Sequence, residues 1–270
     1  MLTEEYSQRA IKASAIVRQR DFAQPWYIAR CLELAETPRF HRKQWEYAVI
    51  AQVYHERIAA GGRVLGFAVG QEPLPAFFAA RGAQVLATDQ ATHQAGGWAT
   101  SGQHANGRDA LRYEGICTPE DLRTQVRFRE VDMRAIPTDL TGFDFVYSSC
   151  AFEHLGSIAA GLQFLVDQVR CLAPGGVFIH TTEFRCGGAP GTLDHAGTVL
   201  FTEAHLRLGM AVLREKYSCN ILPLDLASGE DAWDTYVDHP PYQQDGHLKL
   251  QIGNWVSTSV ALIGGRGHAQ

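Results

Sequence analysis

The sequence predicts an α/β protein with a Rossmann-like, doubly wound sheet of seven mostly parallel strands and an antiparallel last strand. Short apolar runs alternate with amphipathic helical segments from residue 63 to residue 216, the pattern of a parallel sheet covered by helices. The two final strand-like runs, 248–252 and 256–263, have no helix between them, so we expect them to pair antiparallel. Residues 1–60 are expected to form a helical extension, and residues 61–270 one domain.

Composition limits the function classes. A chain of 270 residues that is 46% hydrophobic can bury one large core. A net charge of −5 argues against a nucleic-acid partner or an anionic membrane surface. No apolar run approaches the roughly 20 residues that span a bilayer, and the first residues do not form a signal-peptide pattern. The six cysteines form no C-x-x-C motif, which favours reduced thiols and a cytoplasmic protein.

The N-terminal extension reads as two helices, over 7–20 and 39–60. Both place Ile, Val, Trp and Tyr at three-to-four spacing among charged residues. We expect these apolar faces to pack on the sheet; a lid over a ligand site is the alternative. In a lid, Arg42 and Lys43 could reach a carboxylate, whereas otherwise they form a solvated face.

The central stretch resembles half of a nucleotide-binding βαβ unit. A strand-like run over 64–69 ends at Gly70, a helix-like segment over 73–81 follows, and the next apolar run ends on Asp89. Gly70 permits a tight turn with close approach of a ligand. Pro73 suits the first turn of a helix. Asp89 stands where an acid can bind ribose hydroxyls.

The glycine fingerprint of dinucleotide-binding turns is incomplete here, because its three positions hold Ala68, Gly70 and Glu72. A carboxylate near a helix N-terminus repels a diphosphate but can hold an ammonium group. Glu72 therefore points away from NAD and toward an amino-acid-bearing nucleoside. The alternative is that Glu72 only caps the helix.

The segment after this unit begins with a polar, glycine-rich loop over residues 92–107. Long loops in compact domains are usually functional or mobile, so Trp98 and His104 are candidates for the rim of a polar substrate site. An irregular surface excursion is the alternative. A strand over 126–131 then ends at Asp132.

The next strand, over 143–147, exits through the polar residues Ser149, Glu153 and His154. Ligands bind outside the carboxyl ends of parallel strands, which makes this exit a candidate site. Glu183 ends the following strand at the same edge. Further expected elements are helices over 157–172 and 202–216 and strands over 177–184 and 220–225.

Five motifs in this order resemble a class I S-adenosylmethionine (SAM)-dependent methyltransferase over residues 63–264. They are the strand-and-turn at 64–70, the acid Asp89, the pair at 132–133, the strand exit at 143–155 and the turn at 172–178. Several stretches resemble, more narrowly, bacterial polysaccharide-associated sugar O-methyltransferases. The resemblance implies cofactor contacts from Gly66, Ala68, Gly70, Glu72, Pro73, Asp89, Asp132, Met133 and Ser149.

The sequence departs from this family where the methionine moiety of the cofactor should bind. Gly66 stands where the family usually has an acid, and Glu72 where it usually has glycine. We infer that Glu72 takes over the missing acidic role. Methyl transfer to a sugar hydroxyl also needs a base near neutrality. His154 is the expected base, and Glu183 is expected to orient the hydroxyl or to assist His154; a histidine bonded to backbone is the alternative.

The expected partner is a small-molecule or glycan substrate, contacted by Trp98, His104, His195 and Tyr242. If this segment is helical, Glu153 is expected to point away from His154, because adjacent residues of a helix diverge. Asp194, His195 and an acidic stretch over 231–247 could hold Mg²⁺, although a solvated loop fits as well. A nucleic-acid methyltransferase, an NAD oxidoreductase and a non-catalytic binding protein are rival classes. A homodimer is compatible with the sequence.

Overall fold

A computed structural model describes residues 9–58, 60–94, 96–97, 103–195, 197–242 and 246–267. The candidate substrate residue Trp98 lies outside these ranges, and for His195 only the backbone is described.

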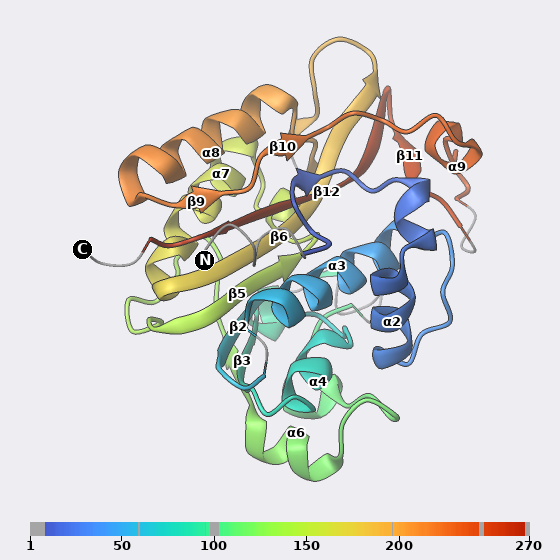
Figure 1. Ribbon diagram of the computed structural model, residues 1–270. Coiled ribbons are helices and arrows are strands. Elements are labelled where there is room, and N and C mark those ends of the chain that lie inside the picture. The colour runs from blue at the N-terminus through green and yellow to red at the C-terminus, as the bar shows by residue number, and fades with distance from the viewer. Residues whose placement is uncertain are drawn as a thin grey trace.

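One mixed sheet runs through the centre of the molecule (Figure 1). Its path is β11-β12-β6-β5-β2-β3-β4. Neighbours from β4 to β6 pair parallel, while β12 pairs antiparallel with both β6 and β11. The predicted mostly parallel sheet with an antiparallel last strand is therefore confirmed. The strands are β2 (Arg63–Phe67), β3 (Gln84–Asp89), β4 (Val126–Glu130), β5 (Phe143–Ser149), β6 (Leu172–Gly188), β11 (Lys249–Ile252) and β12 (Trp255–Gly265).

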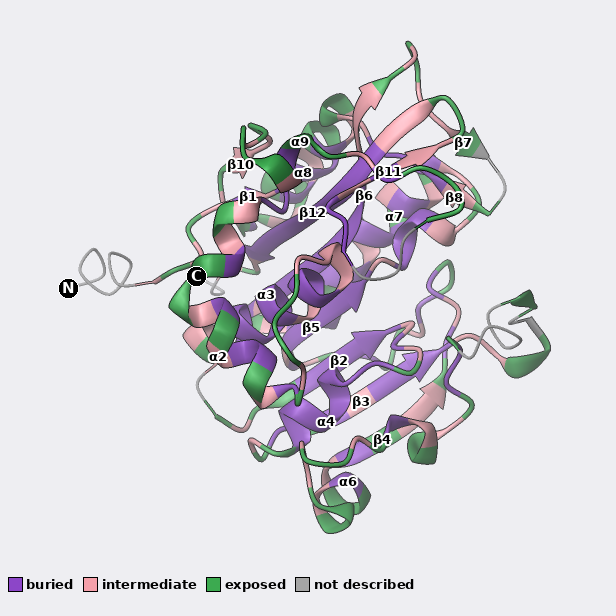
Figure 2. Cartoon of the chain, turned by 90° about the vertical axis from the view of Figure 1, so that its right-hand side faces the viewer, coloured by how far each residue is buried: buried purple, intermediate pink, exposed green. Residues whose placement is uncertain are grey.

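Helices cover both faces of the sheet, and the strands supply apolar side chains to each (Figures 1 and 2). Val64 and Phe145 point into the core under α2, α3, α4 and α6, whereas Leu65 and Val146 point into the core under α7 and α8. Successive side chains of a strand alternate between faces, so apolar runs such as these mark a sheet buried on both sides. The helices are α2 (Pro25–Glu33), α3 (Arg42–Arg57), α4 (Leu74–Ala79), α6 (Pro119–Gln125), α7 (Ile158–Asp167), α8 (Glu203–Tyr217) and the short α9 (Ala232–Thr235).

The expected helix over 7–20 is wrong for the residues described. Ser14–Ala15 form strand β1, which pairs with β10 (Leu224–Asp225), and a 3₁₀ turn η1 (Gln19–Ala23) follows. The hydroxyl of Ser14 accepts a hydrogen bond from the Ile263 N–H at 2.9 Å. Pairing with chain that is distant in sequence thus overrides the apolar spacing, which is only a weak local preference.

The expected strand over 220–225 is divided. Its first part, β9 (Asn220–Ile221), pairs with β12, and its second part is β10, in another sheet. Pro223 stands between the two and has no N–H to donate to a ladder. Smaller elements are β7 (Asp194–His195), β8 (Thr198–Val199) and the 3₁₀ turns η2 (Thr92–Gln94), η3 (Arg108–Leu111), η4 (Phe152–His154) and η5 (Gln168–Cys171).

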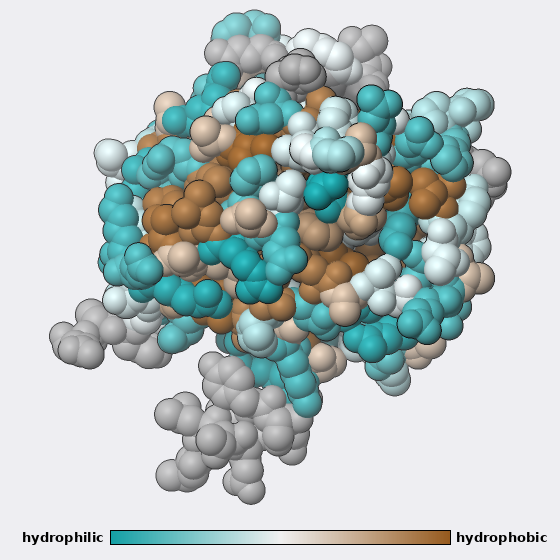
Figure 3. Space-filling view, turned by 90° about the horizontal axis from the view of Figure 1, so that it is seen from above, coloured by the Kyte–Doolittle hydropathy of each residue, from teal (hydrophilic) through white to brown (hydrophobic). Residues whose placement is uncertain are grey.

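The surface seen from above carries apolar patches separated by hydrophilic side chains (Figure 3). Across the described ranges, none of the helices combines the length and apolar character needed to cross a membrane.

Candidate active site

A cavity of about 500 Å³ opens at the carboxyl ends of β2, β3, β4 and β5. This is the edge where parallel sheets bind ligands. Helix α3 contributes Lys43 and Tyr47 to the wall, so the N-terminal extension takes part in the cavity. The candidate residues that line it are Ala68, Gly70, Glu72, Asp89, His104, Asp132, Met133, Ser149 and His154.

The turn after β2 requires a glycine at position 70. Gly70 has a φ of +52°, and a Cβ there would collide with the carbonyl oxygen of Gln103. Its N–H donates to a carboxylate oxygen of Asp89 at 3.1 Å. The backbone therefore comes close to the cavity without a side chain, as the sequence predicts for a ligand-binding turn.

Glu72 is a buried carboxylate without a cation at ion-pair distance in the described chain. Only 4% of the residue is exposed, and its Oε1 has no hydrogen-bond partner there. Burial raises the pKa of Glu72 well above its ordinary value, and the charge of Lys43 opposes this only in part. Pro73 occupies the N-cap position of α4, where no side chain caps the helix. The geometry thus favours a ligand-binding role for Glu72 over a capping role.

Asp89 is bound by the backbone around it. One oxygen accepts from the N–H groups of Gly70 (3.1 Å) and Ala105 (3.0 Å), and the other from Gln90 (2.8 Å). Burial nevertheless raises the pKa of Asp89. Each carboxylate oxygen has two lone pairs, so Asp89 can fix the loop and still accept from a ligand.

Asp132 also has a protein partner, because the guanidinium of Arg134 grips its carboxylate at 2.8 and 3.0 Å. Hydrogen bonding by Arg134 lowers the pKa of Asp132. Asp132 therefore stays charged at the rim of the cavity. The neighbouring Met133 is 6% exposed and offers an apolar surface.

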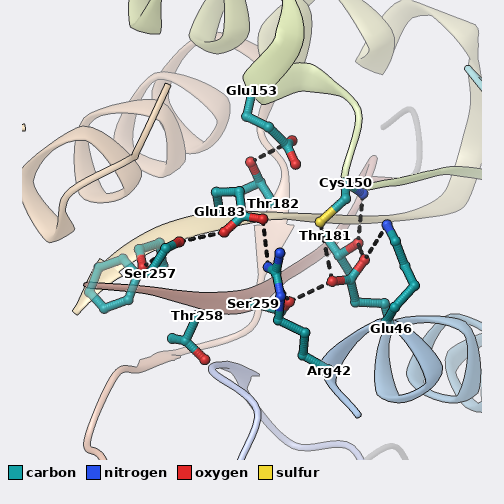
Figure 4. Close-up of polar contacts among 12 residues, drawn as sticks. Arg42, Glu46, Cys150, Glu153, Thr181, Thr182, Glu183, Ser257, Thr258 and Ser259 are labelled. Atoms are coloured by element: carbon teal, nitrogen blue, oxygen red, sulfur yellow. Dashed lines mark hydrogen bonds and ion pairs between the residues drawn. The ribbon is translucent and has the colours of Figure 1, made fainter. Parts of the chain in front are cut away.

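Beside the cavity lies an acid cluster that we define by the carboxylates of Glu46, Glu153 and Glu183 (Figure 4). Glu46 and Glu153 have no exposed surface, and Glu183 has 6%. Buried carboxylates cost several kcal/mol each unless cations and hydrogen bonds compensate them. Helix α3 supplies the cations Arg42 and Lys43, which again makes the N-terminal extension part of the site.

Glu183 is saturated by partners. Arg42 Nη1 lies 2.5 Å from its Oε1, and the hydroxyl of Ser257 donates to its Oε2 (Figure 4). Glu183 lies outside the cavity wall. Its contacts are structural in this arrangement, whereas the sequence predicted that it would meet His154 over a substrate.

Glu46 is equally well satisfied. Lys43 Nζ lies 3.2 Å away and the Ser259 hydroxyl 2.5 Å away. Burial alone would raise its pKa, but Lys43 and Arg42 outweigh burial and hold the pKa of Glu46 below its ordinary value. Further donors to its carboxylate are Ser149, Cys150 and Thr181.

Glu153 and His154 form the turn η4 that leaves β5. The Thr182 hydroxyl donates to Glu153 Oε2 at 2.9 Å, while Oε1 is buried without a hydrogen-bond partner and lies 3.9 Å from His154 Nε2. Burial raises the pKa of Glu153. The expectation that Glu153 points away from His154 is wrong, because it assumed a helix where the chain makes a single 3₁₀ turn.

His154 lines the cavity with 26% of its side chain exposed. Its Nδ1 lies 2.6 Å from the carbonyl oxygen of Gly197. A carbonyl oxygen only accepts, so Nδ1 carries the hydrogen and Nε2 is the basic nitrogen of the neutral ring. The hydrogen bond from His154 to the backbone, which the sequence analysis gave as the alternative to a catalytic role, is thus present. It fixes the tautomer in which Nε2 can act as a base.

Other candidates lie away from the cavity wall. A Cβ on Gly66 would lie 2.7 Å from the ring of Tyr147, so glycine is needed there for packing. The hydroxyl of Tyr242 donates to the Gln251 carbonyl at 2.7 Å. Pro73, Glu183 and Tyr242 are absent from the described lining, and so is His195.

Sequence reasoning missed Glu46 and the position of Glu153. The signal for Glu46 was available, because it is one acid between Trp45 and Tyr47 at the start of the longest apolar run of α3. A charged residue on the buried face of a helix is rarely found without a partner. Glu46 could therefore be expected to contact polar or charged side chains of the sheet.

The candidate metal-ligand cluster found among the described residues does not fit Mg²⁺. In the described ranges, ligand atoms of Cys150, Glu153 and Glu183 lie within 4.8 Å of one another. A thiol is a poor ligand for Mg²⁺, which prefers oxygen, and Arg42 and Ser257 already hold both oxygens of Glu183. Of the acids considered from sequence, Asp194 accepts from an N–H at the start of α7 at 2.6 Å.

The fold and the cavity define an α/β protein with a mostly parallel sheet and a candidate ligand site at the carboxyl edge of that sheet. Residues 65–180, from β2 into β6, match the family described as "Methyltransferase domain". This part of the chain is therefore similar to a methyltransferase domain, which supports a methyltransferase enzyme. A sequence search against curated proteins finds no significant match.

Solved structures with a similar fold include SAM-dependent methyltransferases. A TehB-like SAM-dependent methyltransferase from Corynebacterium glutamicum is 14% identical, with 92% of this chain and 97% of that chain covered and a TM-score of 0.45. The 1,6-didemethyltoxoflavin-N1-methyltransferase of Burkholderia thailandensis is 16% identical, with 91% and 86% covered and a TM-score of 0.46. These similarities are too distant to identify the methyl acceptor.

Proposed function

We propose that the protein is a SAM-dependent O-methyltransferase that acts on a hydroxyl of a sugar, an oligosaccharide or a related small polar molecule. The methyltransferase domain supports the reaction class. The observation that carries the cofactor is Glu72, a buried carboxylate with a bare oxygen in the wall of the cavity. A ligand with an ammonium group would compensate it.

The cavity wall suits the two charges of the methionine moiety of SAM. Glu72 can hold the ammonium group, and Lys43 stands in the same wall for the carboxylate. Gly70 lets the backbone approach the ligand, and Asp89 and Asp132 are the acids that would face ribose and adenine. When bound, SAM supplies a methyl group on a sulfonium, so the protein has to supply positioning and a proton acceptor.

His154 supports a hydroxyl as the acceptor. A sugar hydroxyl has a high pKa and must lose its proton as the oxygen attacks the methyl carbon. His154 lines the cavity, and the Gly197 carbonyl keeps Nε2 basic. An amine or carboxylate acceptor needs no such base when it is already deprotonated.

The cofactor assignment can be tested by calorimetry with S-adenosylhomocysteine (SAH) and with its analogue that lacks the amino group. Glu72→Gln should weaken SAH by about 1–3 kcal/mol, the size of a hydrogen bond to a charged group. The same change should leave the analogue nearly unaffected. Glu114→Gln is the control, because the Glu114 side chain is 89% exposed. Equal losses for both ligands would remove Glu72 from ammonium binding.

The acceptor can be identified by incubating the protein with SAM and a panel of sugars, amines and carboxylic acids, followed by mass spectrometry. A methyl ether on a sugar is the expected product. Methyl amines or methyl esters would point to the alternative acceptors. SAM binding without turnover of any acceptor class would favour a non-catalytic protein of the same fold.

A further inference from the structure

The acid cluster contains one more carboxylate than it has cations. Glu46 has Lys43 at 3.2 Å, and Glu183 has Arg42 at 2.5 Å. Glu153, which has no exposed surface, has one hydroxyl donor on Oε2 and no hydrogen-bond donor on Oε1 in the described chain. A buried carboxylate with such incomplete compensation readily takes up a proton.

His154 is the neighbour that connects this carboxylate to the cavity. Its Nε2 lies 3.9 Å from Glu153 Oε1, and its ring lines the cavity wall. Glu183 cannot serve in the same way, because Arg42 and Ser257 hold both of its oxygens. We propose that Glu153 is a positioning residue that acts through His154, by accepting the proton that the acceptor hydroxyl loses during methyl transfer. The proposal rests on the function proposed above.

The step balances as follows in atoms and electrons. The hydroxyl oxygen forms a bond to the methyl carbon, the carbon–sulfur bond breaks, and its electron pair stays on sulfur. The hydroxyl proton moves to His154 Nε2 and then to Glu153 Oε1, after a side-chain movement that closes the 3.9 Å gap. Nδ1 keeps its hydrogen on the Gly197 carbonyl throughout. The proton returns to solvent through the exposed part of His154 after the methylated product leaves.

The groups that face Glu153 determine how this depends on pH. They are His154 on its own turn, Glu183 on β6 and Lys43 on α3, with the Cys150 thiol nearby. Burial raises the pKa of Glu153, and the charge of His154 lowers it by less. Glu153 must be ionised to accept a proton, so turnover should rise with pH through this raised pKa.

The decisive variant is Glu153→Gln, which keeps the size of the side chain and an oxygen for the Thr182 hydroxyl but cannot be protonated. We expect kcat to fall at least about tenfold, as for other residues that support a catalytic histidine. The acidic limb of the pH profile should change, while SAH affinity stays as in the wild type. Glu114→Gln should change none of these.

Infrared difference spectroscopy gives a readout that does not need turnover. A spectrum at low pH minus one at higher pH should show the carbonyl stretches of protonated buried carboxyls, those of Glu72 and Glu153 among them. Glu153→Gln should lose the part of this absorption that belongs to Glu153, whereas Glu114→Gln should lose none. An unchanged absorption in Glu153→Gln would overturn the proposal.

The outcomes separate this inference from the proposed base. Normal turnover and pH profile in Glu153→Gln, with an inactive His154→Ala, would overturn the role of Glu153 and leave His154 as the base. Normal turnover in His154→Ala would overturn the base itself. Should Glu153→Gln fail to fold, Glu153→Asp is expected to keep the infrared band and part of the turnover; a folded Asp variant without either would also overturn the proposal.

Discussion

Two sets of buried carboxylates lie beside the same cavity and differ in how they are compensated. Glu72 faces the cavity with a bare oxygen, and burial raises its pKa. Glu46 and Glu183 lie behind the cavity, where Arg42, Lys43 and several hydroxyls surround them. The contrast shows that burial alone does not define a binding group. An acid that the protein leaves uncompensated is available to a ligand, whereas a saturated acid holds elements together.

The largest expected effect comes from His154→Ala, which removes the proton acceptor but neither set of carboxylates. We expect kcat to fall about 10²–10⁴-fold with cofactor affinity unchanged. Steady-state kinetics measure kcat, and calorimetry measures the cofactor affinity. Near-normal turnover would remove His154 as the base.

Arg42→Met tests the compensated carboxylates by removing the cation that pairs with Glu183. It leaves Glu183 buried with the Ser257 hydroxyl but without its cation. Loss of one partner of a buried pair costs about 3–5 kcal/mol, so urea should unfold the variant at a clearly lower concentration. Arg123→Met is the matched control, because Arg123 and its partner Glu120 are more than half exposed. If Arg42→Met unfolded at the same urea concentration as the wild type and the Arg123→Met control, the buried pair of Arg42 and Glu183 would not be stabilising.

Glu72, the uncompensated carboxylate, should make the affinity for SAH depend on pH. Its pKa is raised, so the carboxyl holds a proton below that pKa and must release it to bind an ammonium group. SAH affinity should therefore increase with pH, by at most about tenfold per unit, and level off above the pKa. Calorimetry in buffers of different ionisation enthalpy should detect the released proton. In Glu72→Gln both the slope and the proton release should be absent; their persistence would contradict the assignment.

Asp89→Ala is expected to weaken SAH binding by about 1–3 kcal/mol. Three backbone N–H groups already share this carboxylate, so part of the loss reflects a loosened loop rather than a lost ribose contact. An adenosine analogue without ribose hydroxyls separates the two causes, because it should lose only the loop contribution. Unchanged SAH affinity would remove Asp89 from the cofactor site.

Local sequence patterns were sufficient for the sheet and for the turn at Gly70. Apolar runs, glycines and the absence of a final crossover helix depend on neighbouring residues, so the parallel strands β2 to β6 and the antiparallel β12 could be predicted, but not their order in the sheet. The placement of Ser14–Ala15 could not be, because it depends on pairing with residues 224–225. Short strands that pair over such distances leave no periodic pattern.

The arrangement of the acid cluster could not be predicted for the same reason. Its members come from α3, η4 and β6, and the pairs Arg42–Glu183, Ser259–Glu46 and Thr182–Glu153 each join residues that are far apart in sequence. The sequence could not show that Arg42 and Ser257 hold Glu183, or that Glu153 lies beside His154. Which acid is compensated depends on where Arg42 arrives, and only the tertiary structure determines that.

The position of the antiparallel strand β12 late in the chain affects how the protein folds during its synthesis on the ribosome. Ser259 binds Glu46 across 213 residues of chain, and Ser14 binds Ile263 across 249. Helix α3 emerges early, but its buried acid gains this hydroxyl only when the last strand has been translated. A nascent chain that stalls before β12 would expose Glu46 and an unpaired edge of β6, which invites misfolding or capture by a chaperone.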